Sequence, residues 1–317
     1  MSFLRVMTLN IWSQQGPWPR RKELLAAELQ TQAADVVALQ EVLSFTPVPA
    51  PGLDAPPPPF PTQADELRAD LYPYSVFAPA CPVDARRTLG NALLSRFPIV
   101  QQSTVPLPNA VGPGHEPRVL LCALLELSQG LLPVFVTHLD WQLQLSHARC
   151  QQVRFIADHI DAYVAAARQL GRGLLPPILA GDLNAEPDSD EVRFLTGRHA
   201  LPGPLGEPLR GAYFNDCYAR AADPTDFAAR AVAAGATAEV SDGGATFARS
   251  NAFAAAAHEP DRRIDYLLVG LPDKSGRGRP IRCWRCCRHG VIDASVNSAG
   301  QLIFPSDHYG VVADLAL

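Results

Sequence analysis

Short apolar runs alternate along the chain with polar segments and with turns rich in proline and glycine. Apolar residues spaced three and four apart predict covering helices from about Arg20 and over residues 146–170. Apolar runs of strand length, each closed by turn or polar residues, predict buried strands at 3–9, 35–42, 118–127, 133–138, 174–180 and 262–269. This alternation predicts an α/β protein.

Shorter elements fill the intervals. We expect an antiparallel hairpin in which the strand at 90–95 turns at Pro98 into a strand at 99–105. No internal repeat or linker is visible, so we expect a single domain over residues 1–317. The remaining expected elements are helices at 63–71, 188–197 and 228–238, a loop at 202–208, and strands at 74–78 and 311–315.

A proline-rich loop is expected at about residues 46–61, because proline can continue neither a helix nor a strand ladder. The loop leaves the strand that we expect to end at Glu41, so it should hang over the same rim. We favour a lid or a substrate-selecting wall, and a ligand for a docking protein is the alternative.

Charged residues make up 19% of the chain and hydrophobic residues 47%, which is typical of globular proteins. The net charge of −5 offers no global positive field to gather nucleic acid. The apolar start is shorter than an export signal, and no apolar run approaches the ~18 residues of a membrane-spanning helix. We therefore expect no transmembrane segment and a cytoplasmic location.

The seven cysteines are an odd number, and without an export signal we expect reduced thiols rather than disulfides. Cys283, Cys286 and Cys287 resemble half of a zinc site. No second Cys or His pair lies at a suitable spacing, so the sequence does not predict a structural zinc.

The stretch Gly181-Asp182-Leu183-Asn184 closes one of the buried runs and suggests chemistry. In a strand, Asp182 and Asn184 would project side by side while Leu183 enters the core. A carboxylate could take a proton from water there while an amide holds an oxyanion. Gly, Asp and Asn are also ordinary turn residues, so taken alone the stretch is better explained as a simple turn.

Other polar residues stand at predicted strand ends. Asn10 and Glu41 end the two strands of the first β-α-β unit, at the edge where ligands gather in open α/β sheets. His138 ends a third strand. Taken singly, each also fits a turn, a solvated strand end or a structural histidine.

Asp265 lies near the start of the strand at 262–269. Adjacent residues of a strand face opposite ways, so Asp307 and His308 can share a site only if the backbone turns there. Pro305 and Gly310 permit that turn.

Two basic features have competing explanations. Arg118 follows Glu116-Pro117 at a strand start, where it could meet a phosphate or pair with a carboxylate. Residues 274–288 carry lysine and arginine but no acid. A phosphate-rich ligand could use this patch, although we favour a solvated loop and a protected edge strand.

Seven short motifs occur in a definite order over nearly the whole chain, and this order resembles the endonuclease/exonuclease/phosphatase superfamily. That superfamily includes pancreatic-type deoxyribonucleases, abasic-site endonucleases, inositol polyphosphate phosphatases and sphingomyelinases. The motifs are Thr8-Leu9-Asn10-Ile11-Trp12, Leu39-Gln40-Glu41-Val42, residues 90–98, Thr137-His138-Leu139, Gly181-Asp182-Leu183-Asn184, Arg263-Ile264-Asp265-Tyr266 and Ser306-Asp307-His308.

The resemblance implies a four-layer α/β sandwich, in which two face-to-face mixed β-sheets are flanked by helices, and a divalent-metal-dependent phosphoesterase. It makes Glu41 the principal metal ligand, helped by Asn10 and Asp307. A few hard oxygen ligands favour Mg²⁺, with Mn²⁺ as a possible substitute.

The resemblance also implies catalytic roles. Asp182 would orient and deprotonate the attacking water, and Asn184 would steady that water or a phosphoryl oxygen. His308, oriented by Asp265, would contact the phosphoryl oxygens, and His138 would lie against the phosphate from the other side.

Asn91, Arg118 and Trp141 are the candidate substrate-binding residues. Trp12, Trp18 and the proline-rich loop would also give the rim an apolar character. We therefore expect a small or lipid-like phosphodiester or phosphomonoester substrate.

The alternatives are a nuclease that holds DNA or RNA on the 274–288 patch, and a catalytically inactive binding module of the same fold. No partner protein is evident from the sequence.

Overall fold

The computed structural model describes residues 3–46, 61–112, 115–201, 213–221, 243–293 and 300–317. Residues 47–60 of the expected proline-rich loop lie outside the described residues. The same holds for the loop expected at 202–208 and the helix expected at 228–238.

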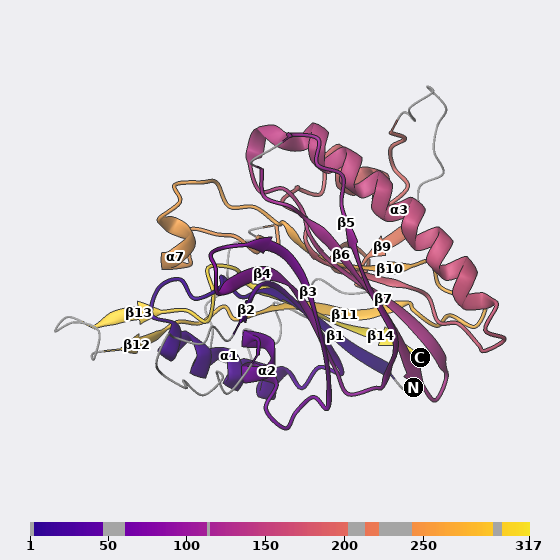
Figure 1. Cartoon of the computed structure of the whole chain (residues 1–317), viewed down its shortest axis with the longest axis horizontal. Coiled ribbons are helices and arrows are strands. Elements are labelled where there is room, and N and C mark those ends of the chain that lie inside the picture. The colour runs from indigo at the N-terminus through magenta and orange to yellow at the C-terminus, as the bar shows by residue number, and fades with distance from the viewer. Residues whose placement is uncertain (1–2, 47–60, 113–114, 202–212, 222–242, 294–299) are drawn as a thin grey trace.

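The first sheet has six strands in the order β11-β14-β1-β2-β4-β3 (Figure 1). The β1–β2 pair is parallel and its connection is helical, whereas the other neighbours are antiparallel. The strands are β1 (Phe3–Asn10), β2 (Val36–Phe45), β3 (Tyr74–Pro82), β4 (Arg87–Ser95), β11 (Pro280–Cys286) and β14 (Gly310–Ala316).

The second sheet also has six strands, in the order β5-β6-β7-β8-β10-β9, and its β7–β8 pair is parallel. A separate ribbon pairs β12 (Val291–Asp293) with β13 (Gln301–Ile303). The strands of the second sheet are β5 (Ile99–Pro106), β6 (Val119–Leu127), β7 (Gly130–His138), β8 (Ile178–Asp182), β9 (Phe214–Asp216) and β10 (Asp265–Gly270).

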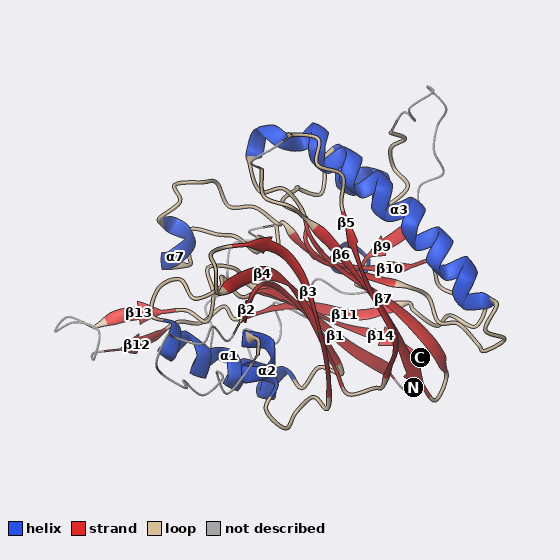
Figure 2. Ribbon diagram, viewed as in Figure 1, coloured by secondary structure: helices blue, strands red, loops and turns tan. Residues whose placement is uncertain are grey.

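Helices lie on both outer sides of the paired sheets (Figure 2). Proline near the start of α1 fits the first helical turn, and Leu25 and Leu29 on its inner face are buried. The helices are α1 (Trp18–Gln32), α2 (Gln63–Arg68), α3 (Ser146–Arg168), α4 (Asp190–Leu195), α5 (Cys217–Arg220) and α7 (Ala252–Ala255), with a 3-10 turn at Leu143–Leu145.

Three buried clusters separate the layers. Leu4 of the first sheet packs with Leu121 of the second in the cluster between the sheets. The α1 leucines pack on the outer face of the first sheet beside Met7, and Ile156 of α3 packs on the second sheet beside Phe135. The predicted four-layer α/β sandwich is therefore confirmed.

The predicted hairpin between residues 90–95 and 99–105 is wrong. Strand β4 belongs to the first sheet and β5 to the second, and β4 pairs with β3 instead. The Ser95 hydroxyl accepts a hydrogen bond from the Phe97 N–H at 2.9 Å, which tightens the crossing. The sequence of this short connection fits a hairpin as well as a corner between sheets, so the turn residues alone could not separate them.

None of the described helices is long and apolar enough to span a membrane. All seven cysteines are free thiols, in agreement with the expectation of reduced cysteines.

Gly181 is required by the close approach of β7 and β8, because a Cβ there would lie 1.9 Å from the Thr137 carbonyl oxygen and its φ is +150°. We expect Gly181→Ala to lower the free energy of unfolding by about 3 kcal/mol through strain and displacement of β8. Urea unfolding measures the change. Gly173→Ala is the matched control, since its nearest neighbour would be 3.7 Å away, and a similar loss in both variants would contradict the argument.

Candidate active site

Three strands deliver polar residues to one edge of the sandwich. Strands β1, β7 and β8 end at Asn10, His138 and Asp182. His138 and Asp182 are register partners in the parallel β7–β8 pair, and the His138 Nε2 lies 3.5 Å from the Asp182 Oδ2. Asn10 Nδ2 donates to the same Asp182 oxygen at 3.1 Å, which joins the first sheet to the second.

Glu41 does not end its strand as predicted, because β2 continues to Phe45. The register shifts between Leu39 and Val42, and Glu41 adopts a φ of 54°. Such a bulge re-aims a side chain. The Glu41 Oε1 consequently accepts a hydrogen bond from Asn10 Nδ2 at 3.1 Å.

The strand geometry predicted for Asn184 is also wrong, because β8 ends at Asp182 and Asn184 has a φ of 48°. The turn nevertheless keeps the two residues together. The Asn184 N–H donates to Asp182 Oδ1 at 2.9 Å, and its amide donates to the Leu139 carbonyl at 3.2 Å. Leu183 is buried in the core, as expected.

His308 and Asp265 form a buried pair beside Asp182. The His308 Nδ1 lies 2.8 Å from Asp265 Oδ2, and its Nε2 lies 3.8 Å from Asp182 Oδ2. Thr246, which sequence reasoning missed, accepts the Asp265 N–H at 3.1 Å and so fixes the start of β10. The Phe247 ring covers the imidazole with 5.1 Å between ring centroids.

The expected turn around Asp307 is organised by Ser306, a role that sequence reasoning missed although Ser306 begins the motif. Its hydroxyl donates to the Asn10 carbonyl at 2.6 Å and lies 3.2 Å from Asp307 Oδ1. The His308 N–H donates back to that hydroxyl at 3.3 Å. The buried Asn251 holds the Ser306 carbonyl at 2.8 Å.

Arg21 is a second feature that sequence reasoning missed, because nothing in a helical pattern marks one arginine as buried. Its guanidinium donates to the carbonyls of Ile11, Gln15 and Pro305, and so ties the loop after β1 to the turn before His308. Burial lowers the pKa of Arg21 to about 10, although the nearby carboxylates of Asp307 and Glu41 oppose that shift.

Negative charge accumulates at the site. Burial raises the pKa of Glu41 and raises the pKa values of Asp182 and Asp307 to about 6. Neighbouring carboxylates add to each shift: Asp182 acts on Glu41, Asp265 on Asp182, and Glu41 on Asp307.

The two histidines respond in opposite ways. Burial lowers the pKa of His138 well below its usual value, and the positive charges of Arg118 and His308 lower it further. Burial also opposes the charge on His308, but the carboxylates of Asp265 and Asp307 outweigh it and raise its pKa well above the usual value. The two shifts therefore favour the neutral form of His138 and the charged form of His308.

A small pocket opens beside Glu41 and His138, and it is lined also by Asn91 and Arg118. Arg118 Nη2 donates to Glu116 at 3.0 Å, and among the described residues no hydrogen bond engages its Nε. Asn91 donates its amide to the Val119 carbonyl at 3.2 Å.

Two of the three tryptophans expected at the rim lie together and the third lies elsewhere: the Arg21 guanidinium lies 4.8 Å from the Trp12 ring centroid and 5.6 Å from that of Trp18. Trp141 is 50% exposed in the loop after β7 and is not among the described residues that line the pocket. Trp12 packs on Phe253 with 4.9 Å between centroids, and Trp18 packs against the α1 cluster.

The basic patch at 274–288 lies on and before the edge strand β11, as we favoured. Several of its arginines already have partners. Arg277 pairs with Asp273 at 2.7 Å, and Arg282 pairs with Asp314.

The donor set fits a hard divalent cation. Asp182, Asp265 and His308 place ligand atoms within 4.8 Å of one another, a group that could bind a metal. Asp265 Oδ1 is buried without a hydrogen-bond partner among the described residues. Clustered carboxylate oxygens, buried and mutually repelling, suit Mg²⁺ or Mn²⁺ better than a soft ion.

A model of the "Endonuclease/Exonuclease/phosphatase family" matches residues 7–308 of the chain. The chain belongs to the endonuclease/exonuclease/phosphatase family. This is a family of metal-dependent hydrolases that act on phosphoester bonds, so the chain is a phosphoesterase of this family. No curated protein sequence matches the chain significantly.

Solved structures of this family share the fold. An endonuclease/exonuclease/phosphatase protein from Beutenbergia cavernae is 25% identical with a TM-score of 0.60, and the match covers 100% of this chain and 72% of that one. Truncated TDP2 from Caenorhabditis elegans is 19% identical with a TM-score of 0.64, over 99% and 98% of the chains. A mannosyl-6-phosphatase from Bacteroides thetaiotaomicron is 17% identical with a TM-score of 0.64, over 99% and 100%.

Proposed function

We propose that this protein hydrolyses a small or lipid-like phosphoester by in-line attack of water that Asp182 activates. The proposal rests on one observation: side chains from β1, β2, β7, β8, β10 and the 305–308 turn converge at one edge of the sandwich. No covalent intermediate is required, because a carboxylate base and a cationic donor flank the same small space.

Glu41 and Asp307, rather than the group of Asp182, Asp265 and His308, would hold a divalent cation, Mg²⁺ or Mn²⁺, because Asp265 and His308 already pair with each other at 2.8 Å. Once bound, it would neutralise the charge that develops on the phosphoryl group. Asn10 is the third ligand that we expected, but its Nδ2 faces both carboxylates while its Oδ1 accepts the Trp12 N–H at 3.0 Å. Asn10 therefore orients Glu41 and Asp182, and its role as a ligand stays a prediction.

Asp182 is placed to act as the base. Its pKa of about 6 lies near neutral pH, where a base is both ionised and able to take a proton. The Asn184 N–H and the Asn10 amide each hold one of its oxygens, which fixes the direction from which it meets water.

His308 would donate a hydrogen bond from Nε2 to a phosphoryl oxygen. The Asp265 carboxylate occupies its Nδ1 and keeps the imidazole charged, so the donor is preorganised for an oxyanion. His138 would contact the phosphate from the opposite side of Asp182 as a neutral imidazole.

The pocket beside Glu41 supports a compact substrate. Arg118 and Asn91 share this pocket with Glu41 and His138, while Leu89 and Pro117 give it an apolar wall. The Arg118 guanidinium is anchored through Glu116 and lies 3.7 Å from Asp140, which would aim it at a phosphate or at the group that leaves it.

A nuclease role has less support. Strand holding needs cations that are free for phosphates, and the pairing of Arg277 and Arg282 with carboxylates weakens the 274–288 patch in this role. The family includes nucleases and phosphatases by its description, and a mannosyl-6-phosphatase shares the fold, so the fold suits either substrate class and the choice rests on the pocket.

A panel of substrates tests the proposal. With Mg²⁺ at physiological salt, we expect turnover of bis-p-nitrophenyl phosphate or sphingomyelin and little nicking of plasmid or cleavage of a single-stranded oligonucleotide. Initial rates measured side by side decide the result. Efficient plasmid nicking would contradict the small-substrate proposal, and failure on every class would favour an inactive binding module.

Asp182→Asn and His308→Ala should each lower kcat by about 10²–10⁴-fold, the usual contribution of a positioned proton-transfer group. The raised pKa of Asp182 means that its charge costs stability at neutral pH, so Asp182→Asn should keep or raise the melting temperature. Steady-state kinetics and thermal unfolding measure both effects. Ser75→Ala, which removes a distant hydroxyl bonded to Asp65, is the control.

Mg²⁺ should raise the melting temperature of the wild type, because a ligand at 100 times its dissociation constant stabilises by about 2.7 kcal/mol. Glu41→Gln should remove most of this shift, since it removes a carboxylate charge from the site. Differential scanning fluorimetry measures the shift without any substrate. An undiminished shift in Glu41→Gln, with Glu23→Gln on the surface of α1 as the control, would rule Glu41 out as the main ligand.

A further inference from the structure

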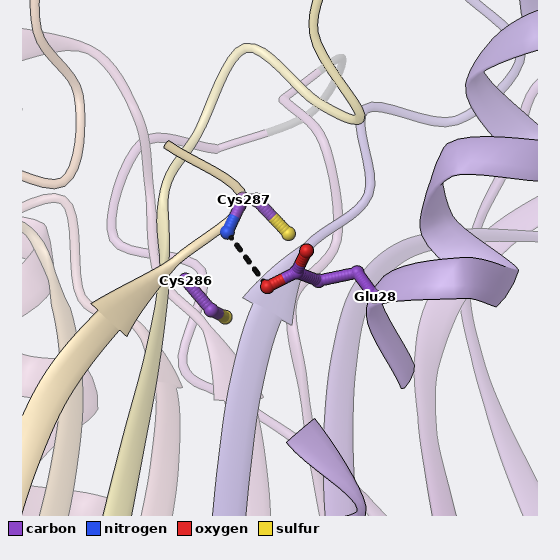
Figure 3. Close-up of side chains that lie close together, drawn as sticks. All are labelled: Glu28, Cys286 and Cys287. Atoms are coloured by element: carbon purple, nitrogen blue, oxygen red, sulfur yellow. Dashed lines mark hydrogen bonds between the residues drawn. The ribbon is translucent and has the colours of Figure 1, made fainter. Parts of the chain in front are cut away.

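A second group of potential ligands lies outside the active site. Glu28 of α1 approaches Cys286 and Cys287 at the end of β11 (Figure 3). One ligand atom from each residue lies within 4.8 Å of the other two. The sequence did not predict zinc because it offered only cysteines, whereas Glu28 stands 259 residues from Cys287.

The backbone turns so that both thiols face the same side. Adjacent residues of a strand point to opposite faces, but β11 ends at Cys286 and Cys287 has a φ of 62°. Both side chains are consequently buried in the cluster that also holds the α1 leucines. A left-handed conformation at a residue other than glycine costs about 1–3 kcal/mol, and such strain concentrates at functional sites.

The carboxylate of Glu28 is already oriented. Its Oε1 accepts the Cys287 N–H at 3.2 Å and the Gln32 amide at 2.8 Å. Gln32 is held in turn by the Trp284 indole N–H at 2.9 Å. Both donors act on Oε1, so among the described residues Oε2 is left to meet a ligand beside the thiols. Such outer contacts typically accompany metal-binding carboxylates.

We propose that Glu28, Cys286 and Cys287 form a binding site for a thiophilic divalent cation of the zinc class. Two sulfur ligands select such an ion over Mg²⁺, and zinc bonds of about 2.0–2.3 Å require only a small closure of the three ligand atoms. No fourth His, Cys, Asp or Glu of the described residues joins the group, so water completes the coordination and the ion is exchangeable. Glu28 is only half-buried, which gives the ion a way in.

The proposed site lies against β14, the strand that follows the turn at residues 305–308. Cys286 is the register partner of Gly310, and a Cβ on Gly310 would lie 2.6 Å from the Cys286 sulfur. Gly310 stands two residues after His308. A cation at the thiols would therefore stabilise the beginning of β14.

Titration with Co²⁺ tests the site directly, in the presence of excess Mg²⁺. A sulfur-to-cobalt charge-transfer band reports thiolate coordination, which the carboxylates and imidazoles of the active site cannot produce. We expect one equivalent of Co²⁺ to give this band in the wild type. Cys286→Ala and Cys287→Ala should each diminish it, and Glu28→Gln should weaken Co²⁺ binding by about tenfold or more.

Two matched variants serve as controls. Cys283→Ala removes a thiol from the same strand that packs between the sheets instead, and Glu23→Gln changes an exposed acid on the same helix. Both should keep the band. Absence of the band in the wild type, its loss in Cys283→Ala as in the Cys286 variant, or unchanged affinity in Glu28→Gln would each overturn the proposal. Glu28→Gln keeps the test decisive if the cysteine variants fail to fold, because Glu28 lies on a helix surface and is only half-buried.

Discussion

The amide Nδ2 of Asn10 joins the two sheets at the point where chemistry is expected. It donates to Glu41 of the first sheet and to Asp182 of the second, at 3.1 Å each. The buried carboxylate of Asp182 and the half-buried carboxylate of Glu41 would repel each other at this separation, and a shared donor offsets part of that cost. The packing of the sheets fixes where Asn10 meets Asp182, so the geometry of the site depends on the core between the sheets.

The polar residues around this amide mainly hold the backbone of the neighbouring loops, and they neutralise little of the negative charge of the carboxylates. Arg21 is fully buried and lies close enough to act electrostatically on Glu41 and Asp307, yet its hydrogen bonds go to backbone carbonyls. The Ser306 hydroxyl likewise bonds to backbone groups: it donates to the Asn10 carbonyl at the end of β1 and accepts the His308 N–H. The loops are therefore held in place while the carboxylates keep an excess of negative charge, which suits a cation.

Apolar runs predicted an α/β protein and several of its strands, whereas the resemblance to the family supplied the four-layer sandwich and the set of residues that meet. The hairpin between residues 90–95 and 99–105 was predicted wrongly. The sequence did not predict the local backbone conformation at the site. The bulge at Glu41 and the left-handed turn at Asn184 arise from pairing with neighbouring strands, and both residues reached the site by routes other than those predicted. Thr246, Arg21 and Glu28 matter through contacts with residues far away in the chain, which periodicity cannot register.

Two kinds of potential metal ligand lie in separate places in the structure. Carboxylate oxygens and an imidazole gather at the edge where the central strands end, whereas two thiols and one carboxylate gather beside α1. Hard and soft cations prefer these sets in opposite order, so each group would disfavour the ion that suits the other. Strand β14 connects them, since its first residue pairs with Cys286 and follows His308 by two positions. The chemistry of the ligands thus decides which cation each group prefers, and strand β14 brings the two groups close together.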